Sequence, residues 1–308
     1  MRDAGGRSVT LVHSRDELDA ALTEVPPVKR FVVMTMGALH AGHAALIKQA
    51  RADAGDSGTV IVTVYVNALQ FNDDADLSRY PRTLQADVSI ADLAGADIVW
   101  APTAVDVFRQ SPEEFDTDPG ALGEMYEGAQ RPGHFRGMLT VVKAFLTALQ
   151  PVAAYFGEKD YQQLALIKQM VQRLAIDTQV IAVPTVREAD GLALSSRNVF
   201  LTSQQRQQAL GISRALFAGQ ACASRGRSAV FEAADAILRA YMLEPDYRAL
   251  VGEDFAHDAS GKARMLIAVK VGDVRLIDNI AIDFTGTQTA VPQSAAANVS
   301  IEPGASSA

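Results

Sequence analysis

Two histidines, His40 and His43, stand three residues apart in segment 36–43, which also contains two glycines. An apolar run precedes this segment and a helical pattern follows it, which predicts a turn from a buried strand into a helix. A helix N-terminus offers unpaired N–H groups and the positive end of a dipole, and both attract phosphate. The imidazoles could add hydrogen bonds to phosphate oxygens. A tight turn with two solvated histidines explains the spacing equally well.

A second candidate phosphate site is Gly157-Glu158-Lys159-Asp160, which is predicted to open a helix. The first N–H groups of that helix would be unpaired, and Lys159 supplies a compact cation for a polyphosphate. Asp160 could hold magnesium, because this ion is usually bound by one or two carboxylates together with substrate phosphates. Taken alone, an ordinary first helical turn explains these residues as well.

A third candidate is the loop at residues 194–198, which combines two serine hydroxyls, the guanidinium of Arg197 and an amide. Such a loop could close over a triphosphate, with Arg197 spreading charge as the leaving group departs. The alternative is a serine-rich linker with one surface arginine.

Three neutral amides follow predicted strands or lie one turn into a helix: Asn67, Gln70 and Gln163. An amide both donates and accepts, which suits a substrate that carries hydroxyl or carboxylate groups, although each could instead cap a strand end. A glycine-rich loop, residues 124–137, holds three more polar side chains that could equally form a salt-bridged surface turn: Glu127, Arg131 and His134.

The elements that must position these side chains alternate between strands and helices. Strands are predicted at 31–34, 59–66, 97–100, 153–156 and 180–183, and helices at 14–22, 44–50, 83–93, 138–149 and 157–174. This alternation predicts an α/β fold with a parallel sheet and right-handed crossovers. In such sheets ligands collect at the carboxyl ends of the strands, where the polar segments described above lie. A short helix and a strand are expected within 102–123.

The pattern changes after a connector at 184–198. Two helices, 202–223 and 229–241, precede two strands, 264–271 and 274–280, that are joined as a hairpin. We therefore expect a doubly wound N-terminal domain over 1–184 and a smaller α+β domain over 185–285. Residues 286–308 offer little to bury, and we expect them to be disordered.

Composition narrows the class of protein. The 308 residues carry a net charge of −8 and form no long basic run, which argues against nucleic acid as a partner. The single cysteine, Cys222, fits a reducing compartment. No apolar run reaches the roughly 18–20 residues that span a bilayer, and the N-terminus does not resemble a signal peptide. We expect a cytoplasmic protein that does not enter a membrane.

Five segments in order resemble the pantothenate synthetase family, and the similarity extends from residue 31 to about 282. They are Thr35-Met36-Gly37-Ala38-Leu39-His40-Ala41-Gly42-His43, Tyr80-Pro81-Arg82-Thr83, Glu127-Gly128 with Arg131-Pro132-Gly133-His134-Phe135, Gly157-Glu158-Lys159-Asp160-Tyr161-Gln162-Gln163-Leu164, and Asp190-Gly191-Leu192-Ala193-Leu194-Ser195-Ser196-Arg197-Asn198. No single segment is specific, but the five together are.

The resemblance implies a Rossmann-like N-terminal domain, a small C-terminal lid and a homodimer. It implies an ATP-dependent ligase that uses Mg²⁺ and joins pantoate to β-alanine through a pantoyl-adenylate. The catalytic residues would be His43, His40, Lys159 and Arg197, which with Mg²⁺ would supply positive charge. The ATP contacts would be Met36, Gly37, His40, Gly42, His43, Gly157, Glu158, Lys159, Asp160, Val186, Leu194, Ser195, Ser196 and Arg197. Pantoate and β-alanine would contact Gln70, Gln163, Asn67 and Met36.

The chain departs from the family pattern at two positions, since Met34 and Ala68 stand where the family usually has proline. Proline fixes φ, so its loss could loosen the loops that hold pantoate and change activity or substrate choice. Two alternatives therefore stay open. One is a related adenylate-forming ligase for a different hydroxy acid, and the other is a catalytically silent paralogue that binds nucleotide.

Overall fold

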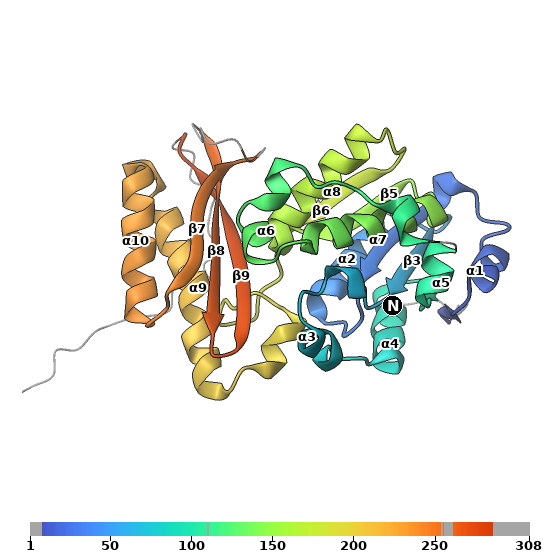
Figure 1. Cartoon of the computed structure of the whole chain (residues 1–308), viewed down its shortest axis with the longest axis horizontal. Helices are drawn as coiled ribbons and strands as arrows, with labels where there is room; N and C mark the ends of the chain where they lie inside the picture. The colour runs from blue at the N-terminus through green and yellow to red at the C-terminus, as the bar shows by residue number, and fades with distance from the viewer. Residues whose placement is uncertain (1–7, 110, 254, 256–260, 286–308) are drawn as a thin grey trace, which may run out of the picture.

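A six-stranded parallel sheet is the centre of the N-terminal part of the computed structural model (Figure 1). The structure describes residues 8–109, 111–253, 255 and 261–285. Strand order is β1-β4-β3-β2-β5-β6, and all neighbouring strands are parallel, which confirms the predicted α/β class. The strands span Thr10–Val12 (β1), Arg30–Thr35 (β2), Thr59–Val64 (β3), Ile98–Trp100 (β4), Ala153–Gly157 (β5) and Gln179–Val183 (β6).

Helices cover both faces of this sheet. They span Arg15–Ala21 (α1), Ala41–Ala54 (α2), Asp74–Arg79 (α3), Leu84–Ala94 (α4), Ala104–Phe108 (α5), Glu127–Gln130 (α6), His134–Leu149 (α7) and Tyr161–Arg173 (α8). Side chains alternate between the two faces of a strand. Val33 and Tyr155 accordingly pack with α2 and α4, whereas Val32 and Phe156 pack with α1, α5, α7 and α8. The sheet is therefore doubly wound, and its strands are apolar on both faces.

The sheet changes its direction of growth at β2. From β2 the chain adds β3 and β4 on one side, and it later adds β5 and β6 on the other side. Connections that leave β2 and β5 in opposite directions open a crevice at the carboxyl ends of the strands, which is where open α/β sheets bind ligands. The turns after β2 and β5 are the first two candidate phosphate segments.

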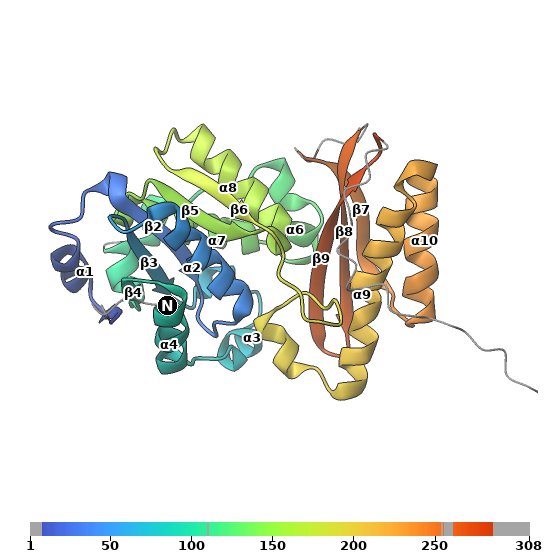
Figure 2. The same cartoon turned by 180° about the vertical axis from the view of Figure 1, so that it is seen from behind.

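A second sheet, antiparallel and three-stranded, forms the C-terminal part of the chain (Figure 2). Its strands are Pro245–Gly252 (β7), Lys262–Val271 (β8) and Val274–Asp283 (β9), and its helices are Ser203–Ala221 (α9) and Arg227–Ala240 (α10). The predicted hairpin is confirmed, and its turn contains Gly272 with a φ of 59°. One face of the sheet packs on α9 and α10 around Leu216 and Met265. The other face carries Leu266, which packs towards Tyr126 and Tyr161 of the N-terminal part.

Two local predictions are wrong. The short helix expected within 102–123 is present as α5, but the described residues after it form two short 3₁₀ turns in place of the expected strand. Proline at position 112 starts one of these turns, and Phe115 packs against Phe108 and not within a sheet. The expected loop at 124–137 contains α6, and α7 begins at His134, one turn earlier than predicted. Strands β1 and β7 had no counterpart among the predictions.

The tail expected to be disordered, residues 286–308, lies outside the described residues. Within the described residues, no helix combines the length and the apolar character needed to cross a membrane.

Candidate active site

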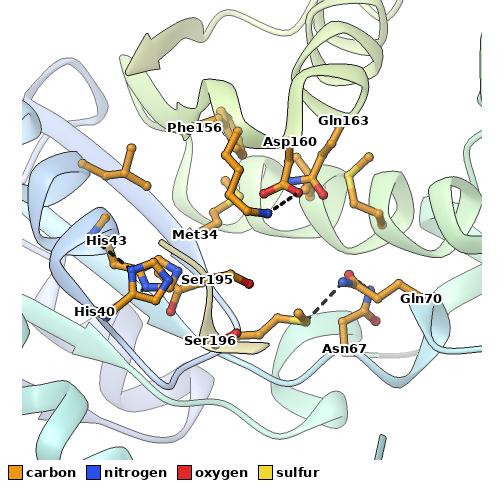
Figure 3. Close-up of a pocket in the computed structure, with 18 of the residues that line it drawn as sticks. Met34, His40, His43, Asn67, Gln70, Phe156, Asp160, Gln163, Ser195 and Ser196 are labelled. Atoms are coloured by element: carbon orange, nitrogen blue, oxygen red, sulfur yellow. Dashed lines mark hydrogen bonds and ion pairs between the residues drawn. The ribbon is translucent and has the colours of Figure 1, made fainter. Parts of the chain in front are cut away.

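One cavity opens where β2, β3, β5 and β6 end, and the three candidate phosphate segments meet around it (Figure 3). Two predicted residues are not on its wall: Gly37 shapes the turn after β2, and the carboxylate of Glu158 pairs with Arg264 of β8 at 3.1 Å. The predicted residues that line the cavity are Met36, His40, Gly42, His43, Asn67, Gln70, Gly157, Lys159, Asp160, Gln163, Val186, Leu194, Ser195, Ser196 and Arg197.

A buried carboxylate holds the turn between β2 and α2. Gly37 and Ala38 both have positive φ angles, 80° and 50°, and the second is unfavourable for a residue with a Cβ. Asp87 of α4, which is 1% exposed, accepts the N–H groups of Ala38 (3.1 Å) and Leu39 (2.8 Å). It also accepts the hydroxyl of Thr83 (3.1 Å). Sequence reasoning missed Asp87, because nothing local marks an acidic residue within a helix as the partner of a distant turn.

Each of the two histidines at the start of α2 has its Nε2 atom available as a hydrogen-bond donor. Nδ1 of His40 accepts the N–H of Gly42 (3.1 Å), and Nδ1 of His43 accepts the N–H of His40 (3.3 Å). An Nδ1 atom that accepts a hydrogen bond carries no proton, so these bonds assign the proton of each neutral ring to Nε2. The ring centroids are 4.2 Å apart. A Cβ at Gly42 would lie 2.8 Å from the His40 ring, so a larger residue here would displace that ring.

Burial makes these imidazoles neutral hydrogen-bond donors. It lowers the pKa of His43 to about 3, and the adjacent His40 is the second cause. Burial is also the main reason that the pKa of His40 is lowered, and the ammonium of Lys159 adds to the effect. Both side chains are half-buried. The lowered pKa of each ring favours its neutral form here, so the positive charge expected of His40 and His43 stays a prediction for the site with phosphate bound.

Charged side chains from two other segments face the histidines. The ammonium of Lys159 lies 3.6 Å from a carboxylate oxygen of Asp160, and Arg197 donates to Asp76 of α3 at 3.3 Å. Burial favours a raised pKa at Asp160, but Lys159 and Arg197 outweigh it and the pKa is lowered, so this carboxylate is ionised. The hydroxyl of Ser195 accepts the N–H of Arg197 (3.2 Å) and shapes the loop that carries the guanidinium.

A chain of buried amides lies beyond β3. Asn67 donates from Nδ2 to Oε1 of Gln70 and to the carbonyl of Gly137, both at 3.0 Å. Gln70 in turn donates to the sulfur of Met36 at 3.2 Å. A thioether is a weak acceptor, so this N–H can be given to a ligand oxygen at little cost. Helix α7 packs so closely here that a Cβ at Gly137 would overlap the carbonyl of Leu69.

Arg131 and His134 support this amide chain, and the interpretation of them as a surface turn is wrong. His134 is 6% exposed and donates from Nδ1 to the carbonyl of Gln70 (2.9 Å), while its Nε2 accepts from Arg131 (3.1 Å). Arg131 donates to the same carbonyl at 3.2 Å. Burial, with Arg131 as the second cause, lowers the pKa of His134 to about 3. Glu127 is also buried and pairs with Arg275 of β9 at 2.5 Å.

Apolar side chains from β2, β5 and α7 form the remaining wall of the cavity. They include Met34, Met138, Val141, Val142, Phe145 and Phe156. Such a wall suits the methyl groups of a small ligand. Met34, one of the two departures from the family pattern, therefore contributes directly to the shape of the site. Tyr80, which sequence reasoning left without a role, brings its hydroxyl within 3.4 Å of the Ser196 hydroxyl.

The donor set fits a magnesium ion that accompanies a phosphate. Asp160 is the one carboxylate among the described residues on the cavity wall. The part of the chain that the structure describes contains no group of three or more histidine, cysteine or acidic residues placed to hold a metal. A single carboxylate matches the way Mg²⁺ is usually held, because substrate phosphates and water supply the other ligands.

Residues 10–281 match the sequence profile of the Pantoate-beta-alanine ligase family. The chain belongs to this family. It is 46% identical to the pantothenate synthetase of a Nocardioides species over 88% of this chain and 85% of the relative. It is 50% identical to pantothenate synthetase 4 of Frankia alni over 85% of each protein.

Solved pantoate–β-alanine ligases also share the fold. The pantothenate synthetase of Thermus thermophilus superimposes with a TM-score of 0.80 at 40% identity, over 88% of this chain and 99% of that one. The ligase of Francisella tularensis, described as complexed with beta-gamma ATP and β-alanine, gives a TM-score of 0.74 at 34% identity, over 88% and 97%.

The neutral state of His134 predicts a pH dependence of stability. Its pKa is about 3 in the folded protein and about 6.5 in an unfolded chain. Between these values the unfolded chain binds one more proton, so the stabilisation is complete above pH 6.5 and is lost as the pH falls. In urea unfolding between pH 6.5 and 4, His134→Gln should reduce the slope of unfolding free energy by about 1.4 kcal/mol per pH unit. His13→Gln, at an exposed histidine, is the control. Equal slopes in His134→Gln and the wild type would contradict the prediction.

Proposed function

We propose that the protein condenses pantoate with β-alanine through a pantoyl-adenylate, with ATP as the second substrate and AMP and pyrophosphate as by-products. One observation carries the proposal. The three phosphate-type segments and the buried amide chain of Asn67 and Gln70 face the same cavity in a member of this ligase family. A ligase that activates an acid needs hydrogen-bond donors that bind the phosphates of ATP. It also needs a small pocket, partly polar and partly apolar, that binds the acid.

In the first step, a carboxylate oxygen of pantoate attacks the α-phosphorus of ATP in line. The new O–P bond forms as the bond to the pyrophosphate oxygen breaks. The protein forms no covalent bond, so positioning and charge stabilisation supply the rate acceleration. Lys159 and Arg197 meet the negative charge that grows on the leaving phosphates. In a protein of net charge −8, this positive charge has to be concentrated at the site.

His40 and His43 donate hydrogen bonds from Nε2 to phosphate oxygens in this proposal. Neutral donors already point into the cavity, so they need no reorganisation when charge develops. The nearby anion also raises the pKa of each ring, which makes proton uptake easier as pyrophosphate leaves. His43 therefore acts first as a fixed hydrogen-bond donor, and it can pass a proton to pyrophosphate only after its ring has taken one up from water.

In the second step, the neutral amine of β-alanine attacks the acyl carbon of the adenylate. The C–N bond forms, the C–O bond to AMP breaks with its electron pair on AMP, and the proton of the amine nitrogen passes to water. Gln70 and Asn67 border the path of the amine. Gln163 and the Nε2 atom of Gln70 hold the polar groups of the pantoate portion, and the apolar wall receives its two methyl groups.

Mg²⁺ would be held by Asp160 and would neutralise phosphate charge. We also propose that the residues implied by the family resemblance contact ATP, including Val186 and Leu194. We further propose that the protein is a homodimer and that each chain divides into two domains, 1–184 and 185–285. The division is supported by separate apolar clusters in the two parts of the chain. Sedimentation analysis of the full chain would test the homodimer.

The reaction itself can be tested directly. With ATP, Mg²⁺, pantoate and β-alanine, the protein should release AMP and pyrophosphate in equal amounts, measured by coupled assay. Without β-alanine, pyrophosphate exchange into ATP should persist. Because Met34 forms part of the apolar wall, a panel of hydroxy acids belongs in the same assay. If the folded protein exchanges pyrophosphate faster with another acid, that acid would replace pantoate as the proposed substrate. Folded protein without turnover for any acid would remove the proposal.

Another prediction separates catalysis from stability at His43. His43→Ala removes one preorganised donor to the phosphates, so kcat should fall by about 10²-fold. It also removes the acceptor of one backbone N–H, which should lower the free energy of unfolding by only about 1 kcal/mol. His13→Ala, at an exposed histidine, is the control for both measurements. A loss of stability large enough to explain the lost activity would argue against the role of His43.

A separate prediction concerns the contact between α7 and the turn at Asn67–Gln70. Gly137→Ala would push this turn away from the cavity, so the KM for pantoate should rise and stability should fall by about 1–3 kcal/mol. Gly211→Ala is the matched control, because its Cβ would collide with Tyr241 in the C-terminal part. The control should lose stability and keep the wild-type KM. The same KM in Gly137→Ala and the wild type would contradict the prediction.

A further inference from the structure

Asn279 of β9 lies next to the Lys159 turn although it belongs to the C-terminal sheet. Its side chain is 4% exposed. Its Nδ2 atom donates to the carbonyl of Glu158 at 2.9 Å and to that of Lys159 at 2.8 Å. Its Oδ1 atom accepts from Arg264 at 2.6 Å. Every polar atom of this side chain is therefore used, and both amide hydrogens are given to one short turn.

The turn that receives these bonds has little internal support. Residues 158–160 form a single 3₁₀ turn between β5 and α8, and Gly157 provides no side-chain cap. Such a turn makes few hydrogen bonds of its own, so outside donors decide its conformation. Arg264 also stabilises this turn, since it pairs with the Glu158 carboxylate at 3.1 Å and lies over the Tyr161 ring at 4.1 Å.

Asparagine is specifically suited to this position. A short side chain must give two N–H donors to neighbouring carbonyls and accept from Arg264 at the same time. Aspartate has the same size and could still accept from Arg264, but it would place an oxygen lone pair against two carbonyl oxygens. Arg187 supports the strand itself, because it donates to the Asn279 carbonyl at 3.3 Å and pairs with Asp278 at 2.6 Å.

We propose that Asn279 is a positioning residue that aims Lys159 at the bound triphosphate. The C-terminal sheet thereby sets the geometry of a phosphate contact in addition to covering the site. The proposal rests on the proposed function, in which Lys159 meets the leaving phosphates. It assigns to Asn279 no contact with substrate, since its amide is committed to the main chain of the turn.

A double-mutant cycle on the full-length protein tests this inference, with ATP and Mg²⁺ binding measured by calorimetry. Lys159→Ala should weaken ATP binding by about tenfold to a hundredfold, as expected for a hydrogen bond to a charged group. Asn279→Ala should weaken it by about tenfold. Because Asn279 acts through Lys159, the double variant should bind ATP like Lys159→Ala alone. A residue that only stabilises the fold would give effects that multiply, and this result would overturn the proposal.

Two further variants separate an effect on the turn from a general loss of stability. Asn279→Asp preserves the size of the side chain, and it should remain folded by thermal melting while ATP binding weakens as in Asn279→Ala. Gln220→Ala is the matched control, because it removes a 2.8 Å amide-to-carbonyl bond to Ala281 of the same strand, away from the turn. Its ATP affinity should stay within about twofold of the wild type.

The outcomes separate the two proposals. Wild-type protein that does not bind ATP would remove the proposed function, and this inference with it. Wild-type protein that binds ATP and turns over, together with unchanged affinity in Asn279→Asp, would leave the proposed function intact and exclude Asn279 as a positioning residue.

Discussion

The start of α2, where His40 and His43 lie, depends on one buried carboxylate. Two consecutive residues, Gly37 and Ala38, adopt positive φ angles. The second of these conformations costs roughly 1–2 kcal/mol for an L-residue. Asp87 offsets it by accepting two successive N–H groups of the turn at 3.1 and 2.8 Å. The turn then delivers His40 to the N-cap of α2, where its ring and that of His43 are fixed by backbone donors. The direction of both Nε2 atoms therefore depends on the contact between Asp87 of α4 and the turn that precedes α2.

Much of the fold and the outline of the site could be predicted from local patterns. The uncharged run that became β3 and the glycine-bounded turns after β2 and β5 carry signals within a few residues, and parallel pairing brings them to one edge. The support of the site could not be predicted in this way. Asp87 contacts a residue 48 positions away, and Asn279 contacts one 121 positions away. No periodicity records such pairs, and the neutral state of the histidines depends on burial that only the folded chain defines.

The site combines a charged side and a neutral side, and this division suits its proposed chemistry. Lys159 and Arg197 supply cations where phosphates would lie, whereas the amide chain of Asn67 and Gln70 carries no charge. Its supporting histidine, His134, is neutral because burial lowers its pKa. The amides can thus hold a hydroxy acid by hydrogen bonds, while the guanidinium of Arg131, which also lines the cavity, is engaged with the carbonyl of Gln70 at 3.2 Å.

The ion pair between Arg197 and Asp76 has a consequence for the entry of nucleotide. The two groups are 3.3 Å apart, and their side chains are 28% and 42% exposed. A pair so open to water contributes less than about 1 kcal/mol. An arriving phosphate can therefore take Arg197 from Asp76 with little resistance, while Tyr80 at the end of α3 keeps its 3.4 Å contact with Ser196 of the loop at 194–198. Nucleotide binding would then cost the protein only one weak ion pair, so most of the attraction between Arg197 and a phosphate would remain as binding free energy.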